Sequence, residues 1–454
     1  MKTETNAKRD ALALAARAVD AARRAGAGEA DAYVRAAGEL RVDWRGGQVE
    51  NIRRASALGL GLRVTAAGRT LLVHTTDTAP GALADLAERA VAMARTLPEP
   101  AEPTLYAEPA DAPAREHPDP ELAAEPLSAK TDRLAAMERA LLGVDGVTTS
   151  DGCSWRETVG AVALASTRGL ALARHLVDIE VSAQAIAERP GDSSTGGRWV
   201  NVPARRHLPD PAEMGRTAGR RAVSMLGARP VPTTRAPVIF TPFTGWTLLS
   251  CLSEPLRGDM AVQERSYLRG SLGAAIAAPG VTIVDDPTLA EGPASRAFDG
   301  EGTPCRRRIL VEGGKLAGFL TDLGSASKLG VAPGGNAGRR GYEQGPAIGT
   351  SNFVLRPGAM KAADIIASTK RGLIVEGLSG WWVGRSAVTD AFSSAAKGFW
   401  VEDGEIVHPV KGVSVAGALR EMLLAVDAVG DDLRITGPTA TPTFRVGEMD
   451  VSGS

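Results

Sequence analysis

The sequence contains few cysteines and no long apolar run. Only Cys153, Cys251 and Cys305 occur in 454 residues, and such an odd, sparse set argues against a disulfide framework and fits a reducing compartment. No stretch of about 18 consecutive apolar residues is present, so we expect no transmembrane helix. The first residues form no apolar signal core. These absences predict a cytoplasmic protein with no membrane partner.

Aromatic residues and an excess of one charge are also lacking. Aromatic side chains make up 4% of the chain, and 52 basic against 53 acidic residues leave a formal net charge of −1. A base-stacking platform needs aromatic side chains, and a phosphate-binding surface needs surplus Lys and Arg. We therefore expect no nucleic-acid partner.

Local metal and cofactor motifs are missing as well. No two of the five histidines lie within one or two helical turns of each other, and no Cys-x-x-Cys is present, so no local zinc motif exists. There is no phosphate-binding Gly-rich loop of either common type. Asp285, Asp286, Asp299 and Glu301 lie in Pro- and Gly-rich sequence, where turn formation is favoured over cation binding. The histidines are His74, His117, His175, His207 and His408.

Candidate nucleophiles give weak signals. Ser325 and Lys328 match a Ser-x-x-Lys pattern, but no second motif of such enzymes accompanies them, and a polar helix start is the favoured interpretation. Cys251 lies among leucines on a predicted helix from Thr241 to about Glu254, which favours a packed thiol over an activated one.

The periodicity predicts an α+β fold, with two helix–strands–helix units followed by a larger, mostly antiparallel β-rich C-terminal domain. Gly46-Gly47 is a hairpin signal, and Asp210 with Pro211 predicts a helix start. We expect a glycine-rich loop over 191–197 and a helix that carries Leu419 to Val426. The expected domains are 1–97 (N-terminal α+β), 98–127 (a Pro/Ala/Glu-rich linker), 128–230 (central α+β) and 231–454 (C-terminal, β-rich).

Seven segments of the second half together resemble the TldD/PmbA family, and their order and spacing hold to the C-terminus. The two upstream units and the Pro-rich break also fit that family, so the resemblance covers essentially the whole chain. The segments are 282–287, 295–302, 335–340, 350–358, 370–373, 398–406 and 429–433.

The resemblance implies a two-chain intracellular peptidase. One chain, of the TldD type, carries a His-Glu-x-x-x-His helix and a distant C-terminal cysteine that together bind zinc. The other, of the TldE or PmbA type, lacks them. The pair is expected to enclose a cavity in which an extended peptide is cut.

The positions that separate the two types can be read in this sequence. Counted from Gly258-Asp259, the two histidine positions fall on Leu249 and Glu254, and the general-base position falls on Ser250. No histidine occurs between His207 and His408, and no cysteine follows Cys305.

We therefore expect no catalytic residue, cofactor or metal in this chain, and zinc in the partner chain. The expected partner is a TldD-like chain in a heterodimer, and the expected substrate is an extended peptide or a small amide. Two alternatives remain: a metal-independent hydrolase that uses Ser250, Cys251 or Ser325, and a regulatory peptide- or protein-binding role related to DNA gyrase modulation.

Overall fold

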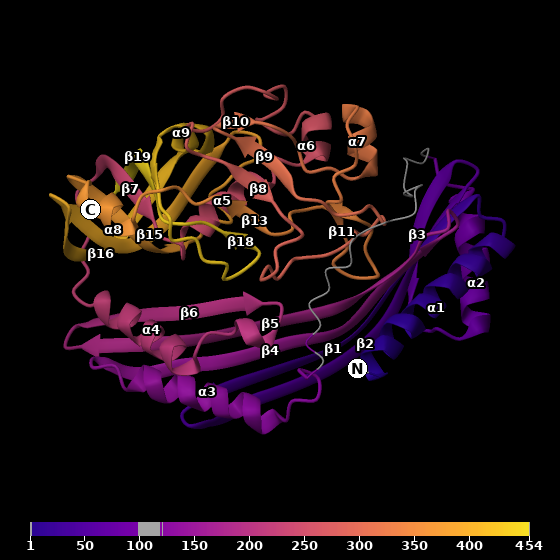
Figure 1. Cartoon of the computed structure of the whole chain (residues 1–454), viewed down its shortest axis with the longest axis horizontal. Coiled ribbons are helices and arrows are strands. Elements are labelled where there is room, and N and C mark those ends of the chain that lie inside the picture. Colours follow the sequence, from indigo (N-terminus) through magenta and orange to yellow (C-terminus); the bar gives the residue numbers. More distant parts are fainter. Residues whose placement is uncertain (1, 99–118, 120, 454) are drawn as a thin grey trace.

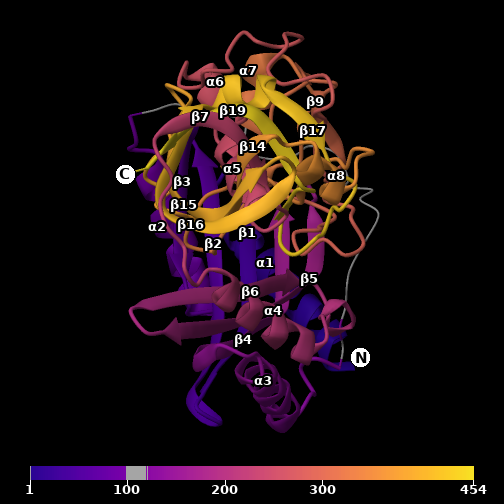
Figure 2. The same cartoon turned by 90° about the vertical axis from the view of Figure 1, so that its left-hand side faces the viewer.

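A curved antiparallel sheet and a β-rich second half make up the molecule. The computed structural model describes residues 2–98, 119 and 121–453, with the side chains of 2–5 excluded. Figure 1 shows helices along the convex side of the sheet and the C-terminal half above its concave side. Figure 2, turned by 90°, shows the same two layers from the end. The predicted α+β class is confirmed.

Both helix–strands–helix units build one six-stranded sheet. β1 and β4 pair over fourteen positions, from Asp31↔Ser166 to Trp44↔Cys153, which joins the first unit to the second. The order β3-β2-β1-β4-β5-β6 is antiparallel throughout. The strands are β1 (Glu29–Arg45), β2 (Gln48–Ala66), β3 (Arg69–Thr75), β4 (Val147–Ser166), β5 (Ala171–Arg189) and β6 (Asp192–Val202).

Four helices cover one face of this sheet. Val34 and Val42 of β1 have the same parity and so point to the same face; Val34 is buried with residues of α1 and α2, and Val42 is buried with residues of α3 and α4. The opposite, concave face is left for the second half of the chain. The helices are α1 (Lys2–Arg24), α2 (Pro80–Ala94), α3 (Leu127–Leu142) and α4 (Pro211–Ser224).

Most of the turns and helix starts predicted from the sequence of this half are present in the structure. Gly46 and Gly47 have φ of 62° and 77° and form the predicted hairpin turn. The Asp210 carboxylate accepts from the Glu213 N–H at 2.8 Å, as expected of an N-cap, although the Glu213 side chain turns to arginines further along α4. The loop expected over 191–197 is wrong, because these residues mostly form β6.

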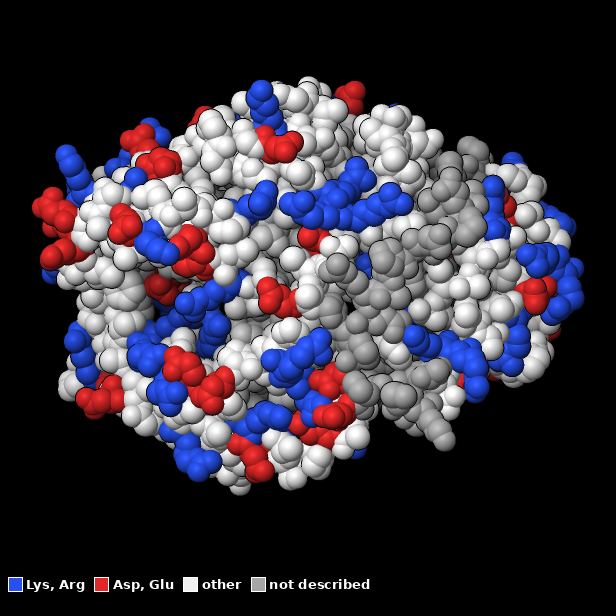
Figure 3. Space-filling model, in the orientation of Figure 1, with Lys and Arg blue, Asp and Glu red and all other residues white. Residues whose placement is uncertain are grey.

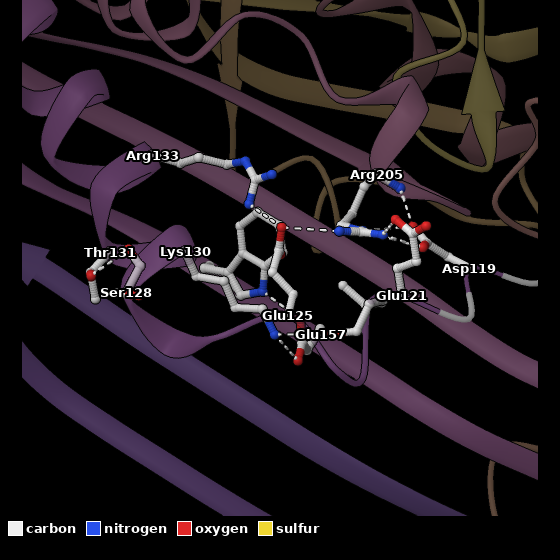
Figure 4. Close-up of polar contacts among 11 residues, drawn as sticks. Asp119, Glu121, Glu125, Ser128, Lys130, Thr131, Arg133, Glu157 and Arg205 are labelled. Atoms are coloured by element: carbon white, nitrogen blue, oxygen red, sulfur yellow. Dashed lines mark hydrogen bonds and ion pairs between the residues drawn. The ribbon is translucent and has the colours of Figure 1, made fainter. Parts of the chain in front are cut away.

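An ionic network holds the chain where α3 begins. Arg205, which follows β6, donates to Asp119, Glu121 and Glu125 at 2.8–3.1 Å (Figure 4). Most of the predicted linker, 98–127, lies outside the described residues.

The C-terminal half is a β-rich layer with short helices. Its two larger sheets have the orders β16-β15-β14-β7-β19-β17 and β10-β9-β8-β13-β18, and β11 pairs with β12. Most pairings are antiparallel, as predicted; β7–β14 and β13–β18 are parallel. The elements are β7 (Thr234–Phe240), α5 (Gly245–Ser253), α6 (Gly258–Val262), β8 (Ile283–Asp285), β9 (Arg308–Glu312), β10 (Lys315–Leu316), α7 (Leu323–Leu329), β11 (Ala337–Gly338), β12 (Ala347–Ile348), β13 (Phe353–Leu355), α8 (Ala362–Ala367), β14 (Arg371–Ser379), β15 (Ala391–Glu402), β16 (Glu405–Ala418), α9 (Leu419–Leu424), β17 (Val426–Val429), β18 (Thr439–Ala440) and β19 (Phe444–Ser452).

The helix expected to reach Val426 is shorter. α9 ends at Leu424, and Val426 instead begins β17 and pairs with Val446 of β19. A β-branched residue fits a pleated strand well, so helical spacing alone misled the prediction here.

A buried ionic group joins the two halves. Asp31 on β1 pairs with Arg63 of β2 and with Arg339 beside β11, and the Asp31 and Arg339 side chains are 1% and 0% exposed. Around it, Tyr33 packs in an apolar cluster with Phe298. These contacts hold the C-terminal half against the concave face of the sheet.

None of the described helices is long and apolar enough to cross a membrane. The three cysteines are buried and form no disulfide.

Candidate functional site

Helix α5 and its C-cap residue, Glu254, carry the positions that correspond to the zinc motif. Leu249 is 5% exposed and belongs to the main apolar core. Ser250 and Glu254 are half-buried, and the Glu254 carboxylate lies 3.8 Å from the Arg385 guanidinium. The helix begins at Gly245, four residues after the expected start at Thr241, and ends at Ser253.

These residues do not fit a zinc ion. Zinc needs three or four imidazole, thiolate or carboxylate donors at about 2.0–2.3 Å, whereas Leu249 offers none and Glu254 is paired with an arginine. Within the described ranges, no group of three or more His, Cys, Asp or Glu side chains is close enough to hold a metal ion. His117 lies outside those ranges.

Two candidate nucleophiles have structural contacts. Cys251 donates to the Thr247 carbonyl at 3.3 Å, and burial raises its pKa to about 11, so it is a thiol at neutral pH. Ser325 forms a capping box with Asp322 at the start of α7, and its hydroxyl donates to that carboxylate at 2.6 Å. The polar helix start expected from the sequence is present.

Asp285 ends β8, whereas Asp286, Asp299 and Glu301 lie in loops, and each of the four carboxylates accepts from a main-chain N–H. Asp299 accepts from the N–H groups of Glu301, Thr303 and Ala337 at 2.9–3.0 Å. Asp285 accepts from the Asn336 side chain at 2.8 Å. The contacts of Asp286 and Asp299 agree with the turn role favoured by the sequence, whereas Asp285 and Glu301 accept from residues far along the chain.

A cavity of about 310 Å³ lies between the concave face of the sheet and residues 293–297. Arg35 of β1 and Asp178 of β5 line it from the sheet, and Ser295 and Arg296 line it from the loop. Burial raises the pKa of Asp178, which accepts from Asn201 at 2.6 Å. The volume is at the lower end of the range for ligand sites, and charged and apolar side chains both line the cavity.

Four tryptophans form a connected row that sequence reasoning missed. Trp199 of β6, Trp246 of α5, Trp381 and Trp382 make successive edge-to-face contacts with ring centroids 6.0, 5.8 and 6.1 Å apart. Trp382 is 62% exposed. The row joins the motif helix to the sheet and to the segment after β14, and only the Trp381-Trp382 pair was visible in the sequence.

This geometry defines a class of protein. It is a two-layer α+β protein with a cavity between its layers, and its motif helix carries no set of metal ligands. Family profiles assign it: PmbA/TldA metallopeptidase domain 1 matches residues 30–94, the central domain matches 120–226, and the C-terminal domain matches 233–453. Metalloprotease PmbA of Escherichia coli O157:H7 is 31% identical over 423 residues, or 91% of this chain and 90% of that protein. The chain belongs to the PmbA/TldD metallopeptidase family.

Other relatives agree with this assignment. A metalloprotease of Methanothermobacter thermautotrophicus is 38% identical over 227 residues, and this match spans 50% of the chain and 49% of that protein. TldE from Thermococcus kodakarensis has the same fold, with a TM-score of 0.87 at 21% identity over 96% of this chain and 99% of that one. The resemblance inferred from the sequence is confirmed.

Proposed function

We propose that this chain is the zinc-free subunit of a two-chain metallopeptidase. Its partner is a TldD-like chain that carries His-Glu-x-x-x-His and supplies the zinc, and this chain completes the peptide cavity. The proposal rests on the lack of metal donors at the motif positions. Leu249, Ser250 and Glu254 offer a single carboxylate, and that carboxylate is paired with Arg385. Without a metal-ligand set, such a helix has no means to polarise water or a peptide carbonyl.

The substrate class is an extended peptide or a small amide. Extended peptides bind strand edges through main-chain hydrogen bonds, and β6 is such an edge strand. The cavity on the concave face has arginines and Asp178 on its walls. Leader peptides of modified natural products, short unfolded peptides and small amides of secondary metabolism all fit this description. The buried free thiols suit the cytoplasm.

Metal analysis of the chain purified alone, and then with its partner, tests the subunit role. We expect no stoichiometric zinc and no peptidase activity for the chain alone, and both for the pair. Tight zinc held by the isolated chain would refute the proposal.

Variants of the pair test whether this chain contributes a nucleophile. Ser250→Ala, Cys251→Ala and Ser325→Ala should leave peptidase activity unchanged, with the exposed Ser327→Ala as the matched control. A large loss of activity in a stable pair would show that this chain is catalytic. Steeply salt-dependent DNA binding would instead revive the gyrase-related role.

A further inference from the structure

The free edge of β6 lies at the seam between the sheet and the C-terminal half. β6 is the last strand of its sheet, and β5 is its strand neighbour. On the other side, Lys397 Nζ donates to the Thr195 carbonyl at 2.8 Å, and Arg221 Nη1 donates to the Gly197 carbonyl at 3.0 Å. The edge is therefore capped by single side chains over these residues.

The main chain of Trp199 is the open part of this edge. The Asn201 N–H points outward and donates to the Thr436 carbonyl at 2.8 Å. Main-chain groups alternate along an edge strand, so those of Trp199 also point outward. Across the described parts of the chain, none of the hydrogen bonds at this edge involves them.

Two arginines lie close to this edge of the sheet. The guanidinium carbons of Arg198 and Arg221 lie 4.4 and 3.3 Å from the centroid of the Phe243 ring. Arg198 Nη1 is buried without a hydrogen-bond partner. Burial, and then Arg221 and Arg434, lower the pKa of Arg198 to about 10, and Glu213 opposes this shift.

Two carboxylates, Glu213 and Glu376, act on these arginines. Glu376 Oε2 lies 3.7 Å from the Arg221 guanidinium, and burial raises the pKa of Glu376. A hollow of about 50 Å³ opens here, lined in part by Gly197, Arg221 and Lys397. Figure 3 shows Lys and Arg side chains gathered on this face between the α4–β6 side and the β-rich half.

We propose that this seam is a carboxylate-binding subsite for an extended peptide. Arg198 and Arg434 supply the charge, and the open main chain of Trp199 aligns the peptide beside β6. Guanidinium groups match carboxylates in shape and charge, and an edge strand offers hydrogen bonds to any extended chain. The subsite rests on the proposed peptide-binding role and adds to it a preference for acidic groups.

Three short peptides test the subsite by calorimetric titration into the full-length chain. N-acetyl-Ala-Ala-Ala with a free carboxylate is compared with its C-terminal amide and with N-acetyl-Ala-Glu-Ala amide. We expect the free acid or the glutamyl peptide to bind about tenfold or more tightly than the trialanine amide. Tighter binding of the free acid would identify a C-terminal carboxylate as the group recognised. Tighter binding of the glutamyl peptide would identify an acidic side chain.

Arginine variants locate the preference. Arg198→Gln and Arg434→Gln should each remove the preference for the carboxylate, whereas Arg235→Gln, an exposed site on β7, should keep it. Arg434 is itself exposed, so its variant should fold normally even if Arg198→Gln does not.

Equal affinity for acid and amide, or no binding of either, overturns the subsite. So does an unchanged preference in Arg434→Gln. Zinc content and the activity of the pair are measured separately, so failure here leaves the test of the subunit role intact.

Discussion

Replacing Arg339 by methionine should loosen the join between the two halves. Its fully buried guanidinium pairs with Asp31, and its Nε donates to the Gly300 carbonyl at 2.8 Å. Removing one partner of a buried ion pair costs about 3–5 kcal/mol. Arg63 remains on Asp31, and Arg339 Nη1 has no partner to lose, so we take the lower end, about 3 kcal/mol.

This free energy corresponds to a measurable change in melting temperature. An unfolding entropy of about 2.1 cal/mol/K per residue gives about 1 kcal/mol/K for the whole chain, and hence a Tm lower by about 3 °C. Differential scanning calorimetry at one scan rate measures it. The control is Arg235→Gln, which breaks ion pairs at a side chain 62% exposed and should shift Tm by less than about 1 °C. Equal Tm values for the two variants would refute the structural role assigned to Arg339.

Two further variants examine buried positions. Burial, and then Asp299, raises the pKa of Glu301 from 4.5 to about 8, so the fold favours the neutral carboxyl and this stability is lost as pH rises through that interval. Glu301→Gln should therefore flatten the fall of Tm between about pH 5 and pH 8, and parallel curves would contradict this. A carbon added at Gly61 would lie 2.0 Å from the Tyr342 carbonyl oxygen, so Gly61→Ala should cost about 1–3 kcal/mol. Gly81→Ala meets nothing within 4 Å and should not lower Tm; equal effects of the two changes would show that the contact with Tyr342 adapts freely.

Elements with strong local chemistry could be predicted from the sequence. The tight hairpin turn at 46–47 requires positive φ, which glycine adopts readily. Asp210 followed by proline is typical of a helix start. The identity of α5 as the motif helix also followed, because its position was set by the nearby Gly258-Asp259 and by the family pattern.

The rest depends on contacts between distant segments. Gly196 was read as loop because glycine weakens strands, yet a carbon there would lie 2.1 Å from the Ala222 N, so the close approach of α4 to β6 requires it. The Trp199–Trp246 contact and the cations around Phe243 join the sheet to the second half of the chain. The periodicity within either segment does not predict these contacts between distant segments.

The ionic group that joins the halves can be completed only late in the synthesis of the chain. Asp31 and Arg339 are 308 residues apart, so at about 5–20 residues per second the acid is synthesised roughly 15–60 s before its second arginine. During that interval only Arg63 can pair with Asp31, so this ionic join to the C-terminal half is incomplete. A nascent chain stalled before residue 339 therefore lacks the ion pair that holds its second half to the sheet.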